Sequence, residues 1–299
     1  MSPPRPGDEG VGPPTAVTGR RTPTTQATVF AMNNGVLVGK NDRLAIEEPL
    51  EIRLLVAESV STISITMRTP GNDFELVAGF LLSEGVIGSR EQIHEIAYCL
   101  DGEPDATQRY NVVTARLVGA PGRASIERLV MTSSACGICG SASIEAVHLA
   151  GHPELETGPV VPFEVLSTFP DVLRSGQAAF SETGGVHGIG LFNQAGEMLC
   201  IREDVGRHNA VDKVLGWAML EGRLPLSESI LMVSGRVSFE IVQKALQAGV
   251  PIVAAVSAAT SLAVGLAENV GMTLVGFLRG SNGVIYSNRQ RIGTSSSRQ

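Results

Sequence analysis

Residues 230–278, ILMVSGRVSFEIVQKALQAGVPIVAAVSAATSLAVGLAENVGMTLVGFL, decide how this chain folds. Short apolar runs alternate in them with longer stretches that are typical of amphipathic helices. The expected elements are strand 230–234, helix 237–248, strand 251–257, helix 260–270 and strand 272–278. Strands joined through helices of this length form right-handed crossovers. We therefore expect an α/β unit with a largely parallel sheet.

The same unit extends upstream, where the pattern continues with shorter strands. Its further elements are a helix over 163–180 broken near Pro170, strands 187–192 and 198–202 around the turn 193–196, and a helix over 207–220. Together with a cysteine-containing stretch before them, these elements predict a domain over residues 131–292.

A smaller α+β unit is expected over residues 28–130. Its elements are strands 50–56 and 61–67, a turn at 69–73, a helix from Asn72 or Asp73 to Gly85, and a strand over 110–117. The Pro-rich residues 1–27 and the last residues, 293–299, contain too few large apolar side chains to offset the entropy of ordering, so we expect disordered tails. The chain as a whole is therefore predicted to be α+β.

Composition excludes several classes of protein. The net charge of −7 argues against a general nucleic-acid binder. Four cysteines in 299 residues are too few for a disulfide scaffold and indicate a reducing cytoplasm. No apolar run reaches the roughly 18 residues of a membrane span. Arg20-Arg21 is followed by the polar TPTTQAT, so it is not a twin-arginine export signal.

The stretch TSSACGICGSAS, residues 132–143, holds Cys136 and Cys139 in a C-x-x-C. Glycines and small residues leave both thiols accessible, and an apolar helical pattern begins at Ser143. A helix N-terminus favours a thiolate, the form that attacks sulfur, binds metal or carries a persulfide. Inert thiols, a structural zinc site and a thioredoxin-type centre are the alternatives. The sequence offers no second pair of ligands for a structural zinc ion. The two cysteines also lie too late in the chain for a thioredoxin-type centre.

Polar residues also follow the predicted strands of the C-terminal unit. They are Ser234-Gly235-Arg236, residues 257–261, and Arg279-Gly280-Ser281-Asn282. Because ligands bind beyond the carboxyl ends of parallel strands, we expect these segments to meet at one edge of the sheet. Small residues, helix N-termini and the guanidinium groups of Arg236 and Arg279 suit an anionic, phosphate-bearing ligand.

A dense polar segment, Glu203 to Lys213 (EDVGRHNAVDK), spans the end of one strand and the start of a helix. Asp204, Arg207, His208 and Asn209 are its best candidates for binding, although a solvated helix face would also explain part of its charge. His187, after two glycines, is either a ligand contact or a structural histidine.

A second motif raises the question of hydrolytic deamination. Zinc nucleoside deaminases carry H-x-E ahead of P-C-x-x-C. Here His152-Pro-Glu154 follows the cysteine pair, and Ala135 replaces the proline, so the ligand order is wrong.

Six stretches in order resemble the FdhD sulfur carrier proteins, accessory factors for formate dehydrogenase. They are TSSACGICGSAS (132–143), FSETGGVHGIGLF (180–192), EDVGRHNAVDKVLG (203–216), SGRVSFEIVQKA (234–245), VSAATSLAVGLA (256–267) and LVGFLRGSNGVIYS (274–287). The resemblance covers roughly residues 28–290. It implies that the second domain is similar in fold to cytidine deaminases but lacks their zinc, so no protein-bound metal is expected.

The resemblance also implies a function. Such proteins accept persulfide sulfur from a cysteine desulfurase and pass it to the molybdenum of bis(molybdopterin guanine dinucleotide), as formate dehydrogenase requires. They bind GDP as a mimic of that cofactor and act as homodimers. Carried over, Cys136 or Cys139 bears the persulfide, with Cys136 preferred. The implied cofactor-binding segment is Phe277, Leu278, Arg279, Gly280, Ser281 and Asn282.

Two other functions stay open at this stage. One is a cofactor chaperone that holds the guanine dinucleotide without transferring sulfur. The other is a thiol–disulfide oxidoreductase, which would reduce a protein disulfide catalytically. The role of the second cysteine also stays open, since it would either displace sulfide or shield the persulfide.

Overall fold

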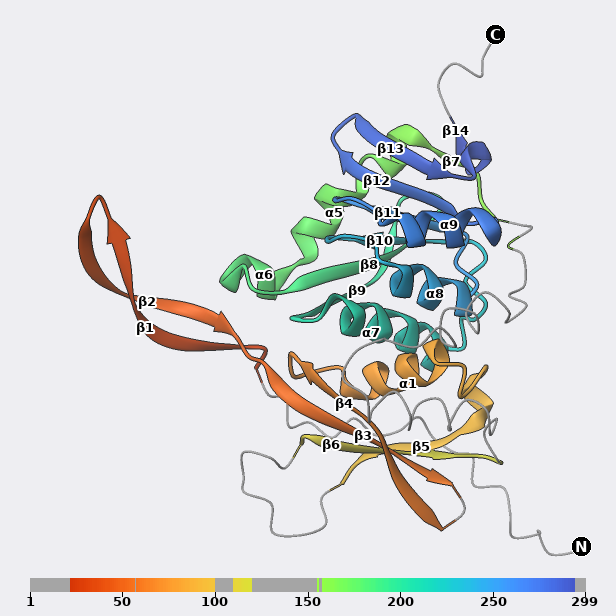
Figure 1. Ribbon diagram of the computed structural model, residues 1–299, viewed down its shortest axis with the longest axis horizontal. Coiled ribbons are helices and arrows are strands. Elements are labelled where there is room, and N and C mark those ends of the chain that lie inside the picture. Colours follow the sequence, from red (N-terminus) through yellow and green to blue (C-terminus); the bar gives the residue numbers. More distant parts are fainter. Residues whose placement is uncertain (1–21, 57, 100–109, 120–154, 156–157, 294–299) are drawn as a thin grey trace, which may run out of the picture.

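The computed structural model describes residues 22–56, 58–99, 110–119, 155 and 158–293. Within them, a six-stranded sheet and a four-stranded sheet are joined through packed helices, and a two-stranded arm extends from the body (Figure 1). The protein is therefore a mixed α+β structure, as the sequence predicts. The cysteine stretch 132–143 and the predicted boundary between residues 130 and 131 lie outside the described residues.

The six-stranded sheet has the order β13-β12-β11-β10-β8-β9. Its strands are β8 (His187–Asn193), β9 (Met198–Asp204), β10 (Ser229–Val233), β11 (Ile252–Ala255), β12 (Thr273–Arg279) and β13 (Asn282–Ser287). The pairings β10–β11 and β11–β12 are parallel, whereas β10–β8, β8–β9 and β12–β13 are antiparallel. The sheet is mixed rather than largely parallel because short turns join β8 to β9 and β12 to β13, and a short turn connects only antiparallel strands.

Helices cover both faces of this sheet. Alternation along β10 sends Leu231 and Val233 into one core, and Ile230 and Met232 into the other. The first core contains side chains of α7 (Arg207–Leu220), α8 (Phe239–Gln247) and α9 (Ser261–Asn269). The second contains side chains of α4 (Phe163–Leu166) and α5 (Phe169–Gly176), which α6 (Ala178–Thr183) follows. The helix predicted over 163–180 thus forms in three pieces.

The four-stranded sheet has the order β4-β3-β6-β5 and is covered by α1 (Asp73–Ser83). Its strands are β3 (Glu48–Val56), β4 (Ser59–Arg68), β5 (Ile93–Tyr98) and β6 (Val112–Leu117), with a short 3-10 turn η1 (Arg90–Gln92) before β5. Helix α1 crosses α7 at Gly79 and Gly216, where an added Cβ would lie 1.8 Å from Asp212 O and from Glu75 O, respectively. Through this crossing, one continuous hydrophobic core joins the two units.

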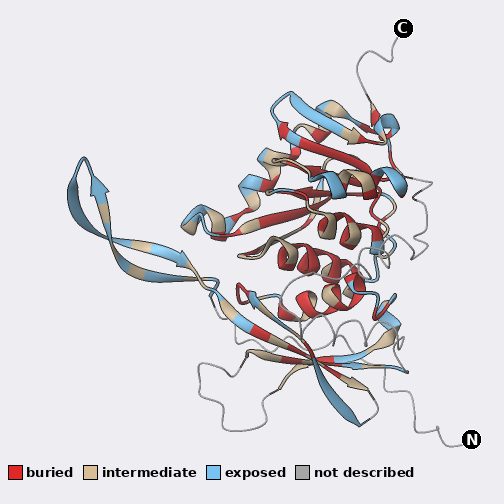
Figure 2. Ribbon diagram, in the orientation of Figure 1, coloured by how far each residue is buried: buried red, intermediate tan, exposed pale blue. Residues whose placement is uncertain are grey.

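The arm is the hairpin of β1 (Thr24–Asn33) and β2 (Val36–Ala45). Strand β1 begins at Thr24, so residues 24–27 belong to a strand and not to the predicted tail. Most of the arm is exposed (Figure 2). Its exposed residues include the apolar Phe30 and Met32. The remaining elements are β7 (Val161–Pro162), which pairs with β14 (Ile292–Gly293), and the 3-10 turn η2 (Arg289–Arg291).

Candidate functional site

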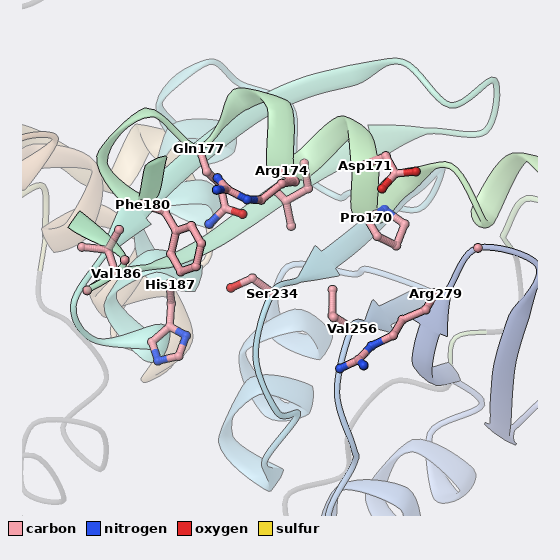
Figure 3. A pocket seen from close by; sticks show the side chains of 14 residues that line it. Pro170, Asp171, Arg174, Gln177, Phe180, Val186, His187, Ser234, Val256 and Arg279 are labelled. Carbon is pink, nitrogen blue, oxygen red and sulfur yellow. The ribbon is translucent and has the colours of Figure 1, made fainter. Parts of the chain in front are cut away.

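A cavity of about 620 Å³ opens where β10, β11 and β12 end (Figure 3). This is the carboxyl edge of the three parallel strands, the usual place for a ligand in such sheets. The lining residues come from α5, α6, the start of β8 and these strand ends: Pro170, Asp171, Leu173, Arg174, Gln177, Phe180, Gly184, Gly185, Val186, His187, Ser234, Val256, Arg279 and Gly280. Of the residues predicted from the sequence to bind the cofactor, the structure brings His187, Arg279 and Gly280 together here.

Arg279 reaches the cavity because β12 departs from regular geometry just before it. The pairing of β12 with β13 shifts register between Gly276 and Arg279, and Phe277 has a φ of 50°, which bulky side chains seldom adopt. The Phe277 N–H donates to Ser257 O at 3.1 Å and holds this bulge. The Phe277 ring is consequently 46% exposed, while the Leu278 side chain lies in the core. Strain of this kind is concentrated at functional sites.

His187 stands on the inner wall of the cavity. Gly235 leaves room for its ring, since a Cβ there would lie 3.2 Å from His187 Nδ1. Burial lowers the pKa of His187 and the nearby Arg207 cation lowers it further, so the imidazole is neutral at neutral pH. Beside it, the Gly188 N–H donates to Ser234 Oγ at 3.0 Å, which leaves the hydroxyl hydrogen for another acceptor. The inner wall therefore offers neutral hydrogen-bonding groups.

Helices α5 and α6 supply the outer wall. The Arg174 guanidinium lies 4.5 Å from the centroid of the Phe180 ring. The Glu203 carboxylate accepts hydrogen bonds at 2.8 Å from the N–H groups of both Ala179 and Phe180, which fixes the start of α6. Figure 3 shows Arg174 and Arg279 on opposite sides of the opening. Two guanidinium groups at the mouth suit phosphate oxygens.

Sequence reasoning missed this outer wall. The apolar spacing over 163–180 predicts helix there, but it does not say which polar side chains face the edge of the sheet. Asp171, Arg174 and Gln177 read as ordinary polar positions of a surface helix. The predicted interruption near Pro170 falls at the start of α5, and the second break, which places Gln177 between α5 and α6, was not predicted.

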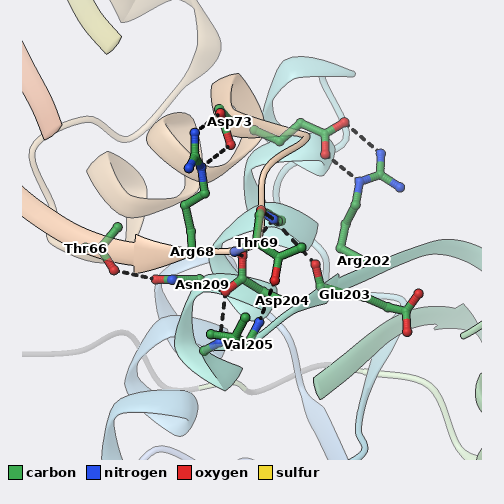
Figure 4. Close-up of polar contacts among 12 residues, drawn as sticks. Thr66, Arg68, Thr69, Asp73, Arg202, Glu203, Asp204, Val205 and Asn209 are labelled. Atoms are coloured by element: carbon green, nitrogen blue, oxygen red, sulfur yellow. Dashed lines mark hydrogen bonds and ion pairs between the residues drawn. The ribbon is translucent and has the colours of Figure 1, made fainter. Parts of the chain in front are cut away.

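Asp204 and Asn209 lie away from the cavity, in a buried network (Figure 4). Asp204 is fully buried and pairs with Lys213 Nζ at 2.7 Å, while the Thr69 N–H donates to the same carboxylate at 3.1 Å. Asn209 Nδ2 donates to Met67 O at 2.8 Å. These contacts tie the start of α7 to the end of β4 and the turn after it. The Asp204 carboxylate is thus buried and paired within the protein, and its predicted contact with the cofactor stays a prediction.

Arg207 and His208 lie in different surroundings, although they are adjacent in sequence. Arg207 acts electrostatically on His187, and its Nε is buried without a hydrogen-bond partner among the described residues. His208 Nε2 lies 2.8 Å from Glu240 Oε2 and lines a second cavity of about 270 Å³, as does Asn209. The hydrogen bond with His208 lowers the pKa of Glu240. Neither Arg207 nor His208 lines the first cavity.

The other predicted cofactor residues also lie outside the cavity lining. Arg236, Ser281 and Asn282 are exposed, and a contact between them and a ligand stays a prediction.

The predicted catalytic residues, Cys136 and Cys139, lie outside the described residues. Of the other two cysteines, Cys99 is half-buried and Cys200 is buried on β9. Burial raises the pKa of Cys200 to about 12, so this thiol is unreactive. In the described part of the chain, no group of three or more His, Cys, Asp or Glu side chains is placed to hold a metal ion.

Comparison with known proteins identifies the family. The sequence model of the FdhD/NarQ family matches residues 45–293. This chain belongs to the FdhD/NarQ family. Its relatives include proteins named sulfur carrier protein FdhD. The one from Streptomyces avermitilis is 48% identical over 275 residues, which cover 90% of this chain and 95% of that protein. The one from Mycobacterium tuberculosis is 47% identical and covers 90% of this chain and 98% of its own length.

A solved structure supports the fold of this FdhD/NarQ chain. The crystal structure of a protein from Desulfotalea psychrophila, named as a formate dehydrogenase accessory protein, superposes with a TM-score of 0.70. It is 27% identical in sequence, and the match covers 91% of this chain and all of that one. The predicted likeness to cytidine deaminases stays a prediction. None of the helices in the described ranges has the length and apolarity needed to span a bilayer.

Proposed function

We propose that this FdhD/NarQ protein is a sulfur carrier that serves formate dehydrogenase. The observation that carries the proposal is the 48% identity to a named sulfur carrier protein over 90% of this chain. The matched length includes the C-x-x-C of Cys136 and Cys139, which are the residues that such chemistry needs. The proposed location is the cytoplasm and the proposed assembly is a homodimer.

The chemistry proceeds by thiol exchange on the cysteine pair. A thiolate, Cys136 by preference, attacks the terminal sulfur of a persulfide on a cysteine desulfurase. The S–S bond of the donor breaks, its cysteine leaves as a thiolate, and Cys136 becomes the persulfide. Attack by Cys139 on the inner sulfur would then release hydrosulfide and leave a disulfide, so that two cysteines are oxidised and one sulfur is reduced. Alternatively, Cys139 shields the persulfide until the acceptor arrives.

The proposed acceptor is the molybdenum of bis(molybdopterin guanine dinucleotide), bound as a substrate. The cavity fits such a molecule in charge and position. Arg174 and Arg279 at its mouth match diphosphate oxygens, while its inner wall carries the neutral groups of His187 and Ser234. GDP contains the guanine and diphosphate of one arm of the cofactor, so it serves as a probe for this site.

Mass spectrometry tests sulfur transfer directly. Full-length protein is incubated with a cysteine desulfurase and cysteine, and the peptide 132–143 is then analysed without a reductant. We expect an added mass of about 32 Da, one sulfur atom, on this peptide. Cys99→Ala is the matched control and should keep the adduct, whereas Cys136→Ala with Cys139→Ala should lose it.

The outcome separates the carrier from its main alternative. If wild-type protein binds GDP but never carries the adduct, the protein is a cofactor chaperone and the sulfur-carrier proposal fails. Catalytic reduction of insulin, with no adduct, would instead indicate a thiol–disulfide oxidoreductase.

A further inference from the structure

Gln177 is a buried polar residue whose side-chain nitrogen has no hydrogen-bond partner among the described residues. It connects α5 to α6, is 4% exposed and lines the first cavity. Its Nε2 is buried and makes no hydrogen bond with any described residue. Rotating the amide by 180° would exchange its nitrogen and oxygen, so Oε1 instead of Nε2 would then occupy this buried position. A buried amide without a partner is costly, so its presence calls for an explanation.

The surrounding backbone holds this amide in place. A Cβ at Gly188 would lie 2.5 Å from Gln177 Nε2, so a larger residue there would displace the amide from its present position. The N–H groups of Ala179 and Phe180, directly after Gln177, are held by Glu203. Glutamine also loses considerable side-chain entropy when it is buried. An apolar residue would fill the same space without these costs, which indicates that the amide binds a group that is not among the described residues.

The cavity around Gln177 suits a flat heterocycle. Figure 3 shows Gln177 beside Phe180 and Arg174, facing the space that His187 and Ser234 border. An aromatic ring and apolar side chains line the cavity together with the amide, while the charged guanidinium groups stand at the mouth. Sites that bind planar ligands combine apolar walls with a few polar groups that fix orientation in this way.

We propose that Gln177 pairs with the lactam edge of the ligand, the adjacent ring N–H and C=O that guanine and pterins share. Its Nε2–H would donate to the ring carbonyl, and its Oε1 would accept from the ring N–H. This inference rests on the proposed function, in which Arg174 and Arg279 hold the phosphates of the cofactor. Gln177 would recognise the heterocyclic ring of the same ligand. It makes Gln177 a determinant of specificity that leaves sulfur loading of the cysteines unaffected.

The test compares ligands that have and lack the ring. Calorimetry measures binding of GDP and of pyrophosphate to full-length wild-type protein and to Gln177→Met, and fluorescence quenching measures binding of free pterin. Two neutral hydrogen bonds correspond to a loss of about five- to a hundredfold in GDP affinity for Gln177→Met. Pyrophosphate affinity should not change. Gln243→Met, at a glutamine of the second cavity, is the matched control and should bind GDP like wild type.

Each outcome bears on the proposal. If Gln177→Met loses affinity for GDP alone, Gln177 binds the guanine ring. If it loses affinity for pterin alone, Gln177 binds the pterin ring. Equal losses for GDP and pyrophosphate, or no loss for either ring, overturn the proposal. If Gln177→Met does not fold, Gln177→Glu keeps the length but removes the donor, and should show the same selective loss. Failure of wild-type protein to bind GDP and pyrophosphate counts against the proposed cofactor site, while the pterin measurement still tests Gln177.

Discussion

The buried pair of Asp204 and Lys213 should be a main determinant of stability and not a ligand contact. Asp204→Asn keeps the shape of the side chain but removes the charge opposite Lys213 Nζ, 2.7 Å away. The Lys213 side chain is 2% exposed, so its ammonium would be left buried without a counter-charge and would donate only to neutral oxygens, such as the carbonyl oxygens of Thr69 and Glu203. Breaking a buried ion pair on one side costs about 3–5 kcal/mol. We expect the free energy of unfolding to fall by that amount.

Urea denaturation measures this loss. Trp217, the only tryptophan of the chain, lies in α7 with Lys213 and reports unfolding by its fluorescence. Asp171→Asn, at an exposed aspartate, is the matched control and should change stability by less than about 0.5 kcal/mol. Removing both charges, with Asp204→Asn and Lys213→Met together, should cost less than the sum of the single changes.

Two results would refute this reasoning. One is a loss below about 1 kcal/mol for Asp204→Asn, which would show that the pair contributes little. The other is weakened GDP binding by a variant of unchanged stability, which would return Asp204 to the ligand site.

Four further predictions concern single residues of the candidate site, the cysteine pair and the helix crossing. Arg279→Ala should weaken GDP binding about ten- to a hundredfold by calorimetry, since a charge-assisted contact contributes roughly 1.5–3 kcal/mol, and unchanged affinity would remove this edge from the site. Cys136→Ala and Cys139→Ala should each impair maturation of formate dehydrogenase while shifting unfolding by no more than about 0.5 kcal/mol, and maturation at the wild-type rate in both would contradict the carrier. The lowered pKa of His187 means that protonation favours the unfolded state, so stability is lost as pH falls below the ordinary value of 6.5. Replacing this residue by Gln should flatten the decline in urea midpoints between about pH 7 and pH 5, and parallel curves would contradict the assignment. Gly79→Ala should destabilise by about 3 kcal/mol in urea denaturation because its Cβ would lie 1.8 Å from Asp212 O, and a loss below about 1 kcal/mol would show that the helices separate easily.

The strands and helices of residues 230–278 could be predicted because their pattern is local. Ile230 and Met232 face one core and Leu231 and Val233 the other, so the whole run is apolar, as a strand covered on both faces requires. The direction of the edge strands was harder to foresee. It depends on pairing between segments, and the mixed sheet follows from short turns that periodicity does not distinguish from crossovers.

The residues of the candidate site also fall into those that the sequence indicated and those that it did not. Arg279 was placed at the edge of the sheet from the sequence because polar residues that follow apolar parallel strands meet at one edge whatever the details of packing, whereas His187 stayed open between a ligand contact and a structural residue. The buried contacts of Asp204 and Asn209 could not be foreseen, since charge density in a segment does not show whether its side chains face a ligand or a neighbouring helix. Gln177 could not be found at all, because its significance lies in a side-chain nitrogen that no described residue pairs with.

The sequence by itself determined the order of the elements, the cysteine pair and the edge at which a ligand would bind. Hydrophobic periodicity, capping and turn residues act over a few positions, so a single chain displays them directly. Only the tertiary structure decided that α1 and α7 cross at Gly79 and Gly216, that Asp204 is an internal counter-ion and that Gln177 faces the cavity. Those features depend on which groups lose water and which partners they meet, and both are set by contacts between residues far apart in the chain.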